Sequence, residues 1–190
     1  MRWLTGSIPD WDTHFQEAYK TLKPGGWVQS YEPSSSYRSD HVEIAEDTAL
    51  WKWGGYFAVQ GSKLLGRSFK AVEDNLPRKA MEVAGFVDIN EHFFKVRGRP
   101  FNSGQTCFDQ PSFQNPMGSW PKEKTLKQVG AVTQQGFEMD IEGYVNLIAS
   151  KSGWTQEEIQ VYIAQLRNEI RSLKYRPYYF QRVIWGRKPQ

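Results

Sequence analysis

Glu32 is the acidic residue that the sequence places best for chemistry. It ends the extended segment WVQSYE, residues 27–32, which follows the Gly25-Gly26 pair. Ligands of open α/β sheets bind beyond the carboxyl ends of the strands, so a carboxylate at such an end faces the substrate. There it can orient the substrate or accept a proton from it. The alternative is that Glu32 is an exposed carboxylate at the end of a strand and has no catalytic role.

The histidines and the cysteine show no metal-binding pattern. His14, His41, His92 and Cys107 are far apart along the chain and have none of the spacings found at zinc sites. One cysteine also excludes an intrachain disulfide, which favours a reducing compartment, either cytoplasmic or nuclear.

Aromatic residues gather between positions 51 and 57, and basic residues follow them. A flat small-molecule substrate would stack on such rings, and core packing is the alternative use of large aromatic side chains. Lys63 and Arg67 flank Gly66 and fit either an anionic substrate or a solvated helix end. The candidate substrate-binding residues are Trp11, Trp51, Trp53, Tyr56 and Phe57.

The composition indicates a globular protein with a sizeable core and argues against two classes of partner. Of 190 residues, 39% are hydrophobic and 15% are aromatic. The net charge is +3 and the basic residues are scattered, so we expect no nucleic-acid partner. We expect no membrane partner either, because no apolar run approaches the roughly 18 residues of a membrane span, and the N-terminus has no signal-like run.

Helical and extended patterns alternate in the N-terminal half. Apolar residues from 11 to 22 recur at helical spacing, with Asp10 as the predicted N-cap. A strand is expected at 27–32, helices at about 41–65 and 69–84, and a second strand at 86–96. Glycines within 54–66 predict interruptions or close packing, and Pro77 predicts either a kink or a late start of its helix. This alternation indicates an α/β fold.

The C-terminal half begins with an irregular stretch. Residues 96–114 are rich in Gly, Pro, Ser and Gln and are predicted to form a loop, after which helical patterns resume at 122–153. Thr155 and Glu158 predict a capping box. The last strand is expected at 178–186. The helix after Thr155 has a predicted buried stripe of Ile159, Ile163, Leu166, Ile170 and Leu173.

Several short motifs also match those of a known family. LKPGGW at residues 22–27 is a general feature of class I methyltransferases, in which it forms the turn before the fifth strand. GSIPDW at 6–11, GSWPKE at 118–123 and GRKP at 186–189 are more specific. With these motifs, the chain resembles the LaeA-type family of fungal S-adenosylmethionine-dependent methyltransferases, which act in secondary metabolism. The match covers nearly the whole chain apart from 96–114.

The resemblance implies a partial class I methyltransferase sheet, Rossmann-like, within a single truncated domain at 1–190. The fifth, sixth and seventh strands would be 27–32, 86–94 and 178–186, and residues 34–66 would form a helical insertion over the acceptor site. The N-terminal cofactor-binding strands, with the Gly-rich loop and the acidic residue for the ribose, would be missing. We therefore expect an open edge at the fifth strand that forms a homodimer or binds a full-length relative.

The resemblance also implies S-adenosylmethionine as the cofactor and assigns residues near it. Arg2, Trp3, Gly6 and Ser7 follow the fourth strand of the family pattern, close to the reactive methyl group, and a frayed chain start is the alternative. The irregular segment 96–114 interrupts the family pattern between HFFK and NPMGSWP. A translated intron is one explanation for it.

Three functions remain open at this point. The first is a methyltransferase that is incomplete as a catalyst. The second is a regulatory module that docks on a complete relative. The third is a methyltransferase-like cyclase or pericyclase that steers a reactive polyene or quinone without methyl transfer, because a fold does not determine a function.

Overall fold

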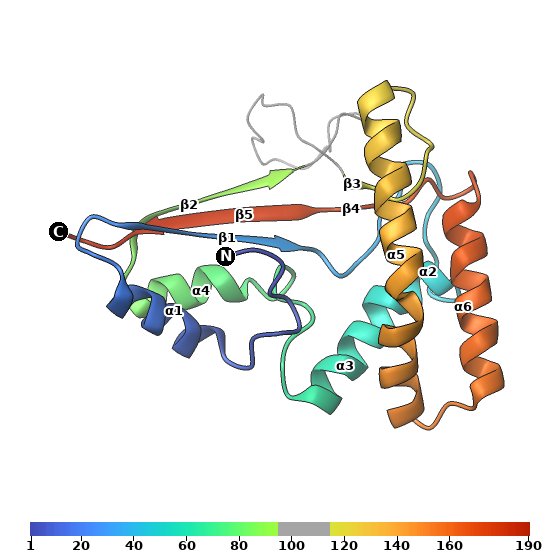
Figure 1. Cartoon of the computed structure of the whole chain (residues 1–190), viewed down its shortest axis with the longest axis horizontal. Helices are drawn as coiled ribbons and strands as arrows, with labels where there is room; N and C mark the ends of the chain where they lie inside the picture. The colour runs from blue at the N-terminus through green and yellow to red at the C-terminus, as the bar shows by residue number, and fades with distance from the viewer. Residues whose placement is uncertain (95–114) are drawn as a thin grey trace.

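A three-stranded sheet organises one part of the chain, and packed helices form the other. The computed structural model describes residues 1–94 and 115–190, and the whole loop predicted at 96–114 lies outside them (Figure 1). The sheet consists of β1 (Trp27–Pro33), β2 (Val87–Phe94) and β5 (Gln181–Arg187) in the order β1-β5-β2. β5 is antiparallel to both neighbours, so β1 and β2 run in the same direction. The three predicted strands are thus present, but the one expected at 178–186 is divided: residues 178–179 form a separate short strand in another sheet.

Two helices cover one face of this sheet. They are α1 (Trp11–Thr21) and α4 (Leu76–Ala84), which lie together below the strands in the view of Figure 1. Asp10 caps α1 as predicted, since its carboxylate accepts a hydrogen bond from the N–H of Asp12 at 3.0 Å. Hydrogen bonds from Thr13 and Asp12 lower the pKa of Asp10. The core between helices and sheet contains Trp11, Phe15, Val28, Ala80, Met81, Phe86 and Ile184.

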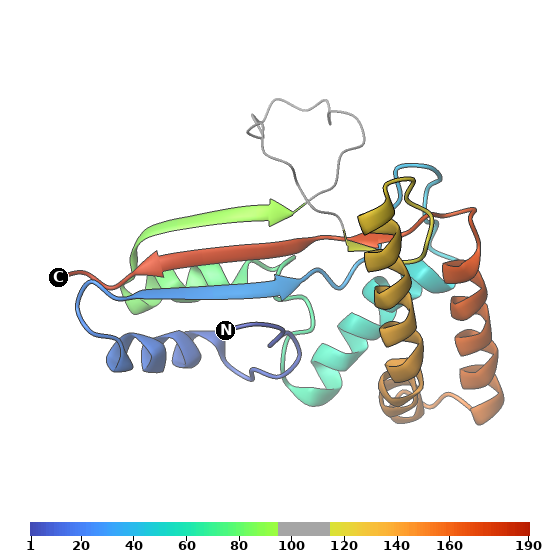
Figure 2. The same cartoon turned by 45° about the horizontal axis from the view of Figure 1, so that its top comes forward.

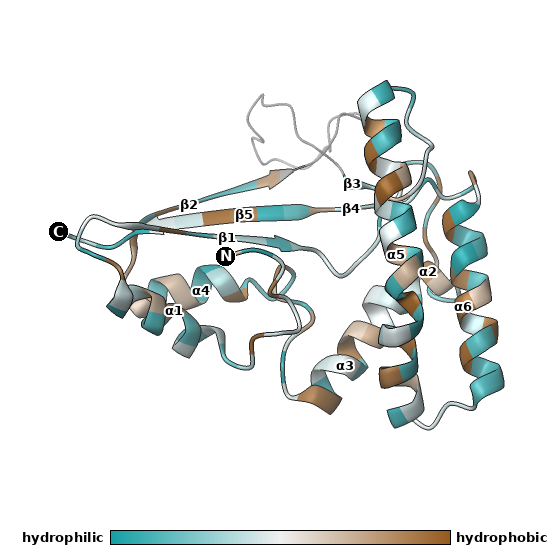
Figure 3. Ribbon diagram, viewed as in Figure 1, coloured by the Kyte–Doolittle hydropathy of each residue, from teal (hydrophilic) through white to brown (hydrophobic). Residues whose placement is uncertain are grey.

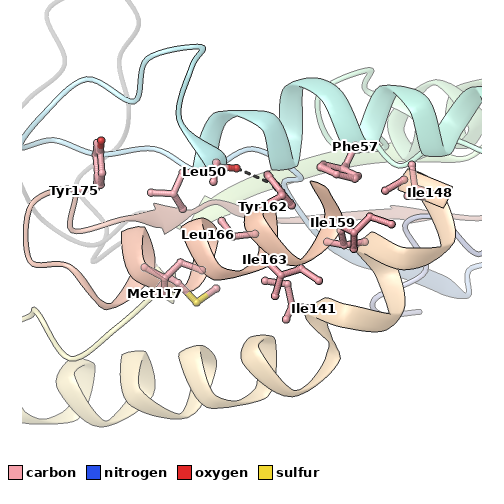
Figure 4. Close-up of a cluster of buried hydrophobic side chains, with 14 of the residues drawn as sticks. Leu50, Phe57, Met117, Ile141, Ile148, Ile159, Tyr162, Ile163, Leu166 and Tyr175 are labelled. Atoms are coloured by element: carbon pink, nitrogen blue, oxygen red, sulfur yellow. Dashed lines mark hydrogen bonds between the residues drawn. The ribbon is translucent and has the colours of Figure 1, made fainter. Parts of the chain in front are cut away.

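The second part surrounds a larger core. Its helices are α2 (Ala49–Lys52), the π-helix η1 (Trp53–Phe57), α3 (Ala58–Leu65), α5 (Lys124–Lys151) and α6 (Gln156–Arg171). Short strands β3 (Asn115–Pro116) and β4 (Tyr178–Tyr179) pair beside them. Figure 4 shows side chains from these helices meeting, with the hydroxyl of Tyr162 donating to the Ala49 carbonyl at 3.0 Å. The predicted capping box of Thr155 and Glu158 begins α6.

Three sequence predictions need correction here. The helix expected from 41 begins only at Ala49, because the Ser39 hydroxyl accepts the N–H groups of His41 and Val42 and forms a turn. The helix expected from 69 begins at Leu76, which is the late start that Pro77 allowed. Leu173 lies beyond the end of α6 and is 68% exposed, so it is not part of the buried stripe.

The helices carry their apolar residues on limited faces. Figure 3 shows hydrophobic and hydrophilic residues alternating along α5 and α6. The glycines of the α2–α3 region serve close packing, as predicted: a Cβ on Gly54 would lie 2.8 Å from the backbone of Ser35 and Ser36. A Cβ on Gly61 would lie 2.9 Å from Ile148. Small residues therefore bring η1 against the segment after β1 and α3 against α5.

Candidate functional site

The first residues of the chain pair with the outer edge of β1. The N–H of Trp3 donates to the Tyr31 carbonyl at 3.0 Å, and the N–H of Tyr31 donates to the Met1 carbonyl at 3.1 Å. The amino group of Met1 donates to the Gln29 carbonyl at 2.7 Å. These bonds form a parallel bridge between Arg2 and Tyr31. The outer edge of β1 is thus shaped to receive a parallel strand.

Glu32 fixes the turn that follows this pairing. Its side chain is buried, and one carboxylate oxygen accepts hydrogen bonds from the N–H groups of Leu4 and Thr5, both at 2.8 Å, and from the Thr5 hydroxyl at 3.0 Å. Its other oxygen accepts from the Ser30 hydroxyl at 3.4 Å. Glu32 is therefore not the exposed carboxylate of the simpler alternative. The geometry supports a positioning role, and its catalytic role stays a prediction.

Trp3 lies in a strained backbone conformation next to that turn. Its φ is +58°, a region that bulky residues rarely adopt and that persists only where the surroundings enforce it. The bonds on either side, to Tyr31 and from Leu4 to Glu32, supply this enforcement. The indole is 53% exposed and meets Tyr179 edge-on, with ring centroids 6.5 Å apart. An exposed aromatic ring is thus held at the carboxyl end of β1.

Gly6 and Ser7 complete the turn in different ways. Gly6 has a φ of +76° and donates its N–H to the Ser68 carbonyl at 3.0 Å. A Cβ on Gly6 would lie 2.5 Å from the ring of Phe69, so packing against that ring requires glycine. The N–H of Ser7 closes the turn by donating to the Leu4 carbonyl at 2.8 Å, and its side chain is exposed.

Aromatic rings connect Trp3 to Phe69 through the helical part of the molecule. Successive ring centroids along this path are between 4.6 and 6.5 Å apart. Because Phe69 packs against Gly6, the path begins and ends at the N-terminal segment. We call this set the aromatic arc; its members are Trp3, Tyr179, Tyr37, Phe137, Trp53, Tyr144 and Phe69.

The tyrosines of the aromatic arc are neutral at physiological pH. Burial raises the pKa of Tyr179 to about 12 and raises the pKa values of Tyr37 and Tyr144 well above the usual tyrosine range. Their hydroxyl groups are therefore hydrogen-bonding and packing groups, not bases. The arc offers flat walls and does not supply a general base of its own.

The predicted substrate-binding aromatics fall into different environments. Trp53 is in the aromatic arc, and Trp51 is 37% exposed on α2. The Tyr56 hydroxyl accepts a hydrogen bond from the indole N–H of Trp154 at 3.1 Å. Trp11 and Phe57 are buried in the two hydrophobic cores because they lie on the inward faces of their helices. Trp11 and Phe57 therefore pack in the core, which was the alternative to substrate binding.

Sequence reasoning did not identify most of the arc or the turn that Glu32 holds. Tyr37, Phe137, Tyr144 and Tyr179 come from separate segments, so no sequence spacing connects them. The partners of Glu32 lie 27 and 28 positions away. Within residues 1–94 and 115–190, no group of His, Cys, Asp and Glu side chains is arranged to hold a metal ion. No helix in these ranges is long and apolar enough to cross a membrane.

Comparison with known proteins gives fungal methyltransferases as homologues. Methyltransferase pytC of Aspergillus terreus is 28% identical over 169 residues, which cover 88% of this chain and 45% of pytC. Probable methyltransferase tdiE of Emericella nidulans is 26% identical and is matched over 49% of its length. Secondary metabolism regulator LAE1 of Cochliobolus heterostrophus is 23% identical and is matched over 56%. The chain spans about half the length of these relatives. No protein-family model matches it.

The solved structures that resemble the chain include a Haemonchus contortus phosphoethanolamine N-methyltransferase 2 with S-adenosyl-L-methionine. The TM-score is 0.41 at 16% identity, and the match covers all of this chain and 32% of that protein.

Proposed function

We propose that the chain supplies the acceptor-side half of an S-adenosylmethionine-dependent methyltransferase of fungal secondary metabolism. The observation that carries this proposal is the parallel pairing of residues 1–3 with the outer edge of β1. A parallel strand at that edge is what a doubly wound α/β sheet requires beside β1. The order β1-β5-β2, with an antiparallel strand in the middle, agrees with the three strands implied by the family resemblance.

The described residues form only one wall of a cofactor site. S-adenosylmethionine supplies the methyl group when it is bound. The exposed ring of Trp3 and the turn after it face the edge where the cofactor would lie. However, the Phe69 ring fills the space beside Gly6, and the Glu32 carboxylate already accepts hydrogen bonds from backbone N–H groups. These residues do not hold the cofactor by themselves. We propose that strands added beyond β1 provide the remaining contacts.

The chain's own residues position and shield the reacting groups. Methyl transfer by direct displacement depends mainly on aligning the acceptor and excluding water. Glu32 fixes the turn beside Trp3, and the aromatic arc offers flat walls next to it. Trp53, which we predicted to bind substrate, belongs to this arc. We propose a flat, weakly polar acceptor that stacks on the exposed part of the arc.

Residues 1–3 cover only part of the outer edge of β1, and a partner can cover the rest. Trp27 at the start of β1 is 53% exposed, and strand edges readily pair with other chains. We propose that this edge pairs with a second copy or with a complete relative to form the cofactor site. The same edge is the observation that favours the second candidate function, a docking module that binds a complete relative and not S-adenosylmethionine.

Calorimetric titration of S-adenosylmethionine, combined with sedimentation analysis of the same sample, tests the proposal. We expect binding only in an assembled species. Gln29→Pro should abolish assembly and binding because it removes an outward N–H from the edge, whereas Gln29→Val keeps that N–H and should preserve both. A folded assembly that never binds S-adenosylmethionine would favour the second candidate function, the docking module. Binding by a monomer would contradict the role proposed for the edge.

A further inference from the structure

A hollow of about 430 Å³ lies beside the C-terminal end of α3, and none of its lining residues belongs to the aromatic arc. Its size is that of a small-molecule pocket. One face of α3 forms one wall, the segment from 66 to 74 forms another, and Pro9 contributes from the N-terminal segment. The α3 residues in the wall are Val59, Ser62 and Lys63.

Three cationic side chains and one carboxylate line the hollow. The cations are Lys63, Arg67 and Lys70, and the carboxylate is Asp74. Within the part of the chain that the structure describes, none of the three cations forms an ion pair. The half-exposed arginines elsewhere are different, since Arg78 and Arg167 each lie 2.9 Å from a glutamate oxygen. The hollow therefore has an excess of positive charge that residues 1–94 and 115–190 do not neutralise.

The C-terminal end of α3 accounts for the positions of only some of these cations. Lys63 lies in the last turn of α3, and the Nε of Arg67 donates to the Leu65 carbonyl at 3.4 Å, as expected of cations near a helix C-terminus. That bond uses one of the five donors of a guanidinium group. Lys70 lies beyond the helix end at Leu65, outside the range of the helix dipole. Its half-buried position in the hollow needs another explanation.

Hydrogen bonds that involve backbone groups hold the segment that carries Arg67 and Lys70. The N–H of Phe69 donates to the Ser62 hydroxyl at 3.0 Å, and the N–H of Lys70 donates to the Ser68 hydroxyl at 3.0 Å. The Ser68 carbonyl accepts the N–H of Gly6 at 3.0 Å. Arg67 and Lys70 therefore extend from an ordered segment, which lowers the entropic cost of binding a ligand between them.

We propose that this hollow binds the oxyanion of a small organic molecule, either a carboxylate or a phosphate monoester. The guanidinium of Arg67 suits two-point contact with such a group, and Lys63 and Lys70 add point charges. Val59 and Pro9 give the apolar part of the ligand a surface to contact. This site is separate from the proposed cofactor edge, so it stands whether or not the chain transfers methyl groups.

Titrations of the full chain followed by amide NMR test the proposal with three probes: inorganic phosphate, phenyl phosphate and benzoate. We expect shifts concentrated at residues 62–70, with phenyl phosphate binding several-fold more tightly than phosphate because of the apolar wall. Saturation by phenyl phosphate but not benzoate would identify a phosphate ligand, and the reverse would identify a carboxylate. If no probe shifts these amides, the proposal is overturned.

Matched variants separate this site from general attraction to a basic protein. Arg67→Gln with Lys70→Gln should weaken binding of the preferred probe about tenfold or more, because each cation makes a charge-assisted contact. Lys20→Gln with Lys23→Gln makes the same change in net charge elsewhere and should leave the affinity within about twofold. Asp74→Asn should tighten binding about threefold, since it removes the one carboxylate among the described lining residues. Equal weakening by both double variants would contradict a specific site.

Discussion

The sheet unit (α1, α4, β1, β2 and β5) and the helical unit (α2, η1, α3, α5 and α6) bury their apolar residues to different extents. Most of the largest fully buried side chains are in the helical unit, among them Leu50, Phe57 and Leu166. The sheet unit has fewer and carries helices on one face (Figure 2). The helical unit is therefore largely complete by itself, whereas the sheet unit has an edge and a face that a partner can cover.

We therefore expect the two units to contribute differently to the stability of the fold and to assembly with a partner. Changes in the core of the helical unit should lower the free energy of unfolding, and changes at the β1 edge should alter assembly with little effect on the fold. Three variants test the packing of the helical unit, the contact between the two units and the contact between α5 and α6.

The largest effect is expected for Leu166→Ala in α6. Leu166 is fully buried, and replacing such a leucine by alanine costs about 2–5 kcal/mol of unfolding free energy through lost burial and the cavity that remains. Urea denaturation measures this cost. Val161→Ala on the same helix is the control, because Val161 is 68% exposed and should change stability by less than about 0.5 kcal/mol. Similar losses from both variants would show that α6 is not packed as described.

Gly6→Ala should have a smaller effect at the contact between the two units. Alanine at a φ of +76° is strained, and its Cβ would lie 2.5 Å from the Phe69 ring, so we expect a loss of about 1–3 kcal/mol. Phe69→Leu in the same chain should recover part of that loss. A double-mutant cycle by urea denaturation would show this non-additivity. Strictly additive losses would contradict the contact.

The smallest effect is the pH dependence of the α5–α6 contact. Hydrogen bonds from Arg171 hold the pKa of Glu138 below the usual range of a glutamate. A carboxyl with a lowered folded-state pKa stabilises the fold above about pH 4.5, and this contribution is lost as the pH falls through the folded-state pKa. Glu138→Gln should flatten the melting temperature profile between neutral and acidic pH. A profile that Glu138→Gln leaves unchanged would contradict this contribution.

Local sequence signals predicted most elements. Asp10 and the box of Thr155 and Glu158 act within a few residues of their partners, and both cap their helices as expected. The helix start at Ala49 was not predicted because the Ser39 hydroxyl competes locally for backbone N–H groups.

The candidate site was less predictable because its contacts are long-range. Glu32 was identified by its position at a strand end, but its partners Leu4 and Thr5 come from another segment. Trp11 and Phe57 are aromatic residues of the kind that lines pockets, yet helix orientation buries both of them. Residue type alone therefore did not separate pocket walls from core.

Amide hydrogen exchange along β1 tests the central claim, that its outer edge receives a parallel strand. Tyr31 donates outward to Met1, and by the alternation of a strand Gln29 carries the next outward N–H. In the monomer we predict fast exchange at Gln29 and slow exchange at Val28 and Ser30, whose N–H groups face β5. In the species that binds S-adenosylmethionine, Gln29 should become protected. Fast exchange at Gln29 in that species would contradict the account.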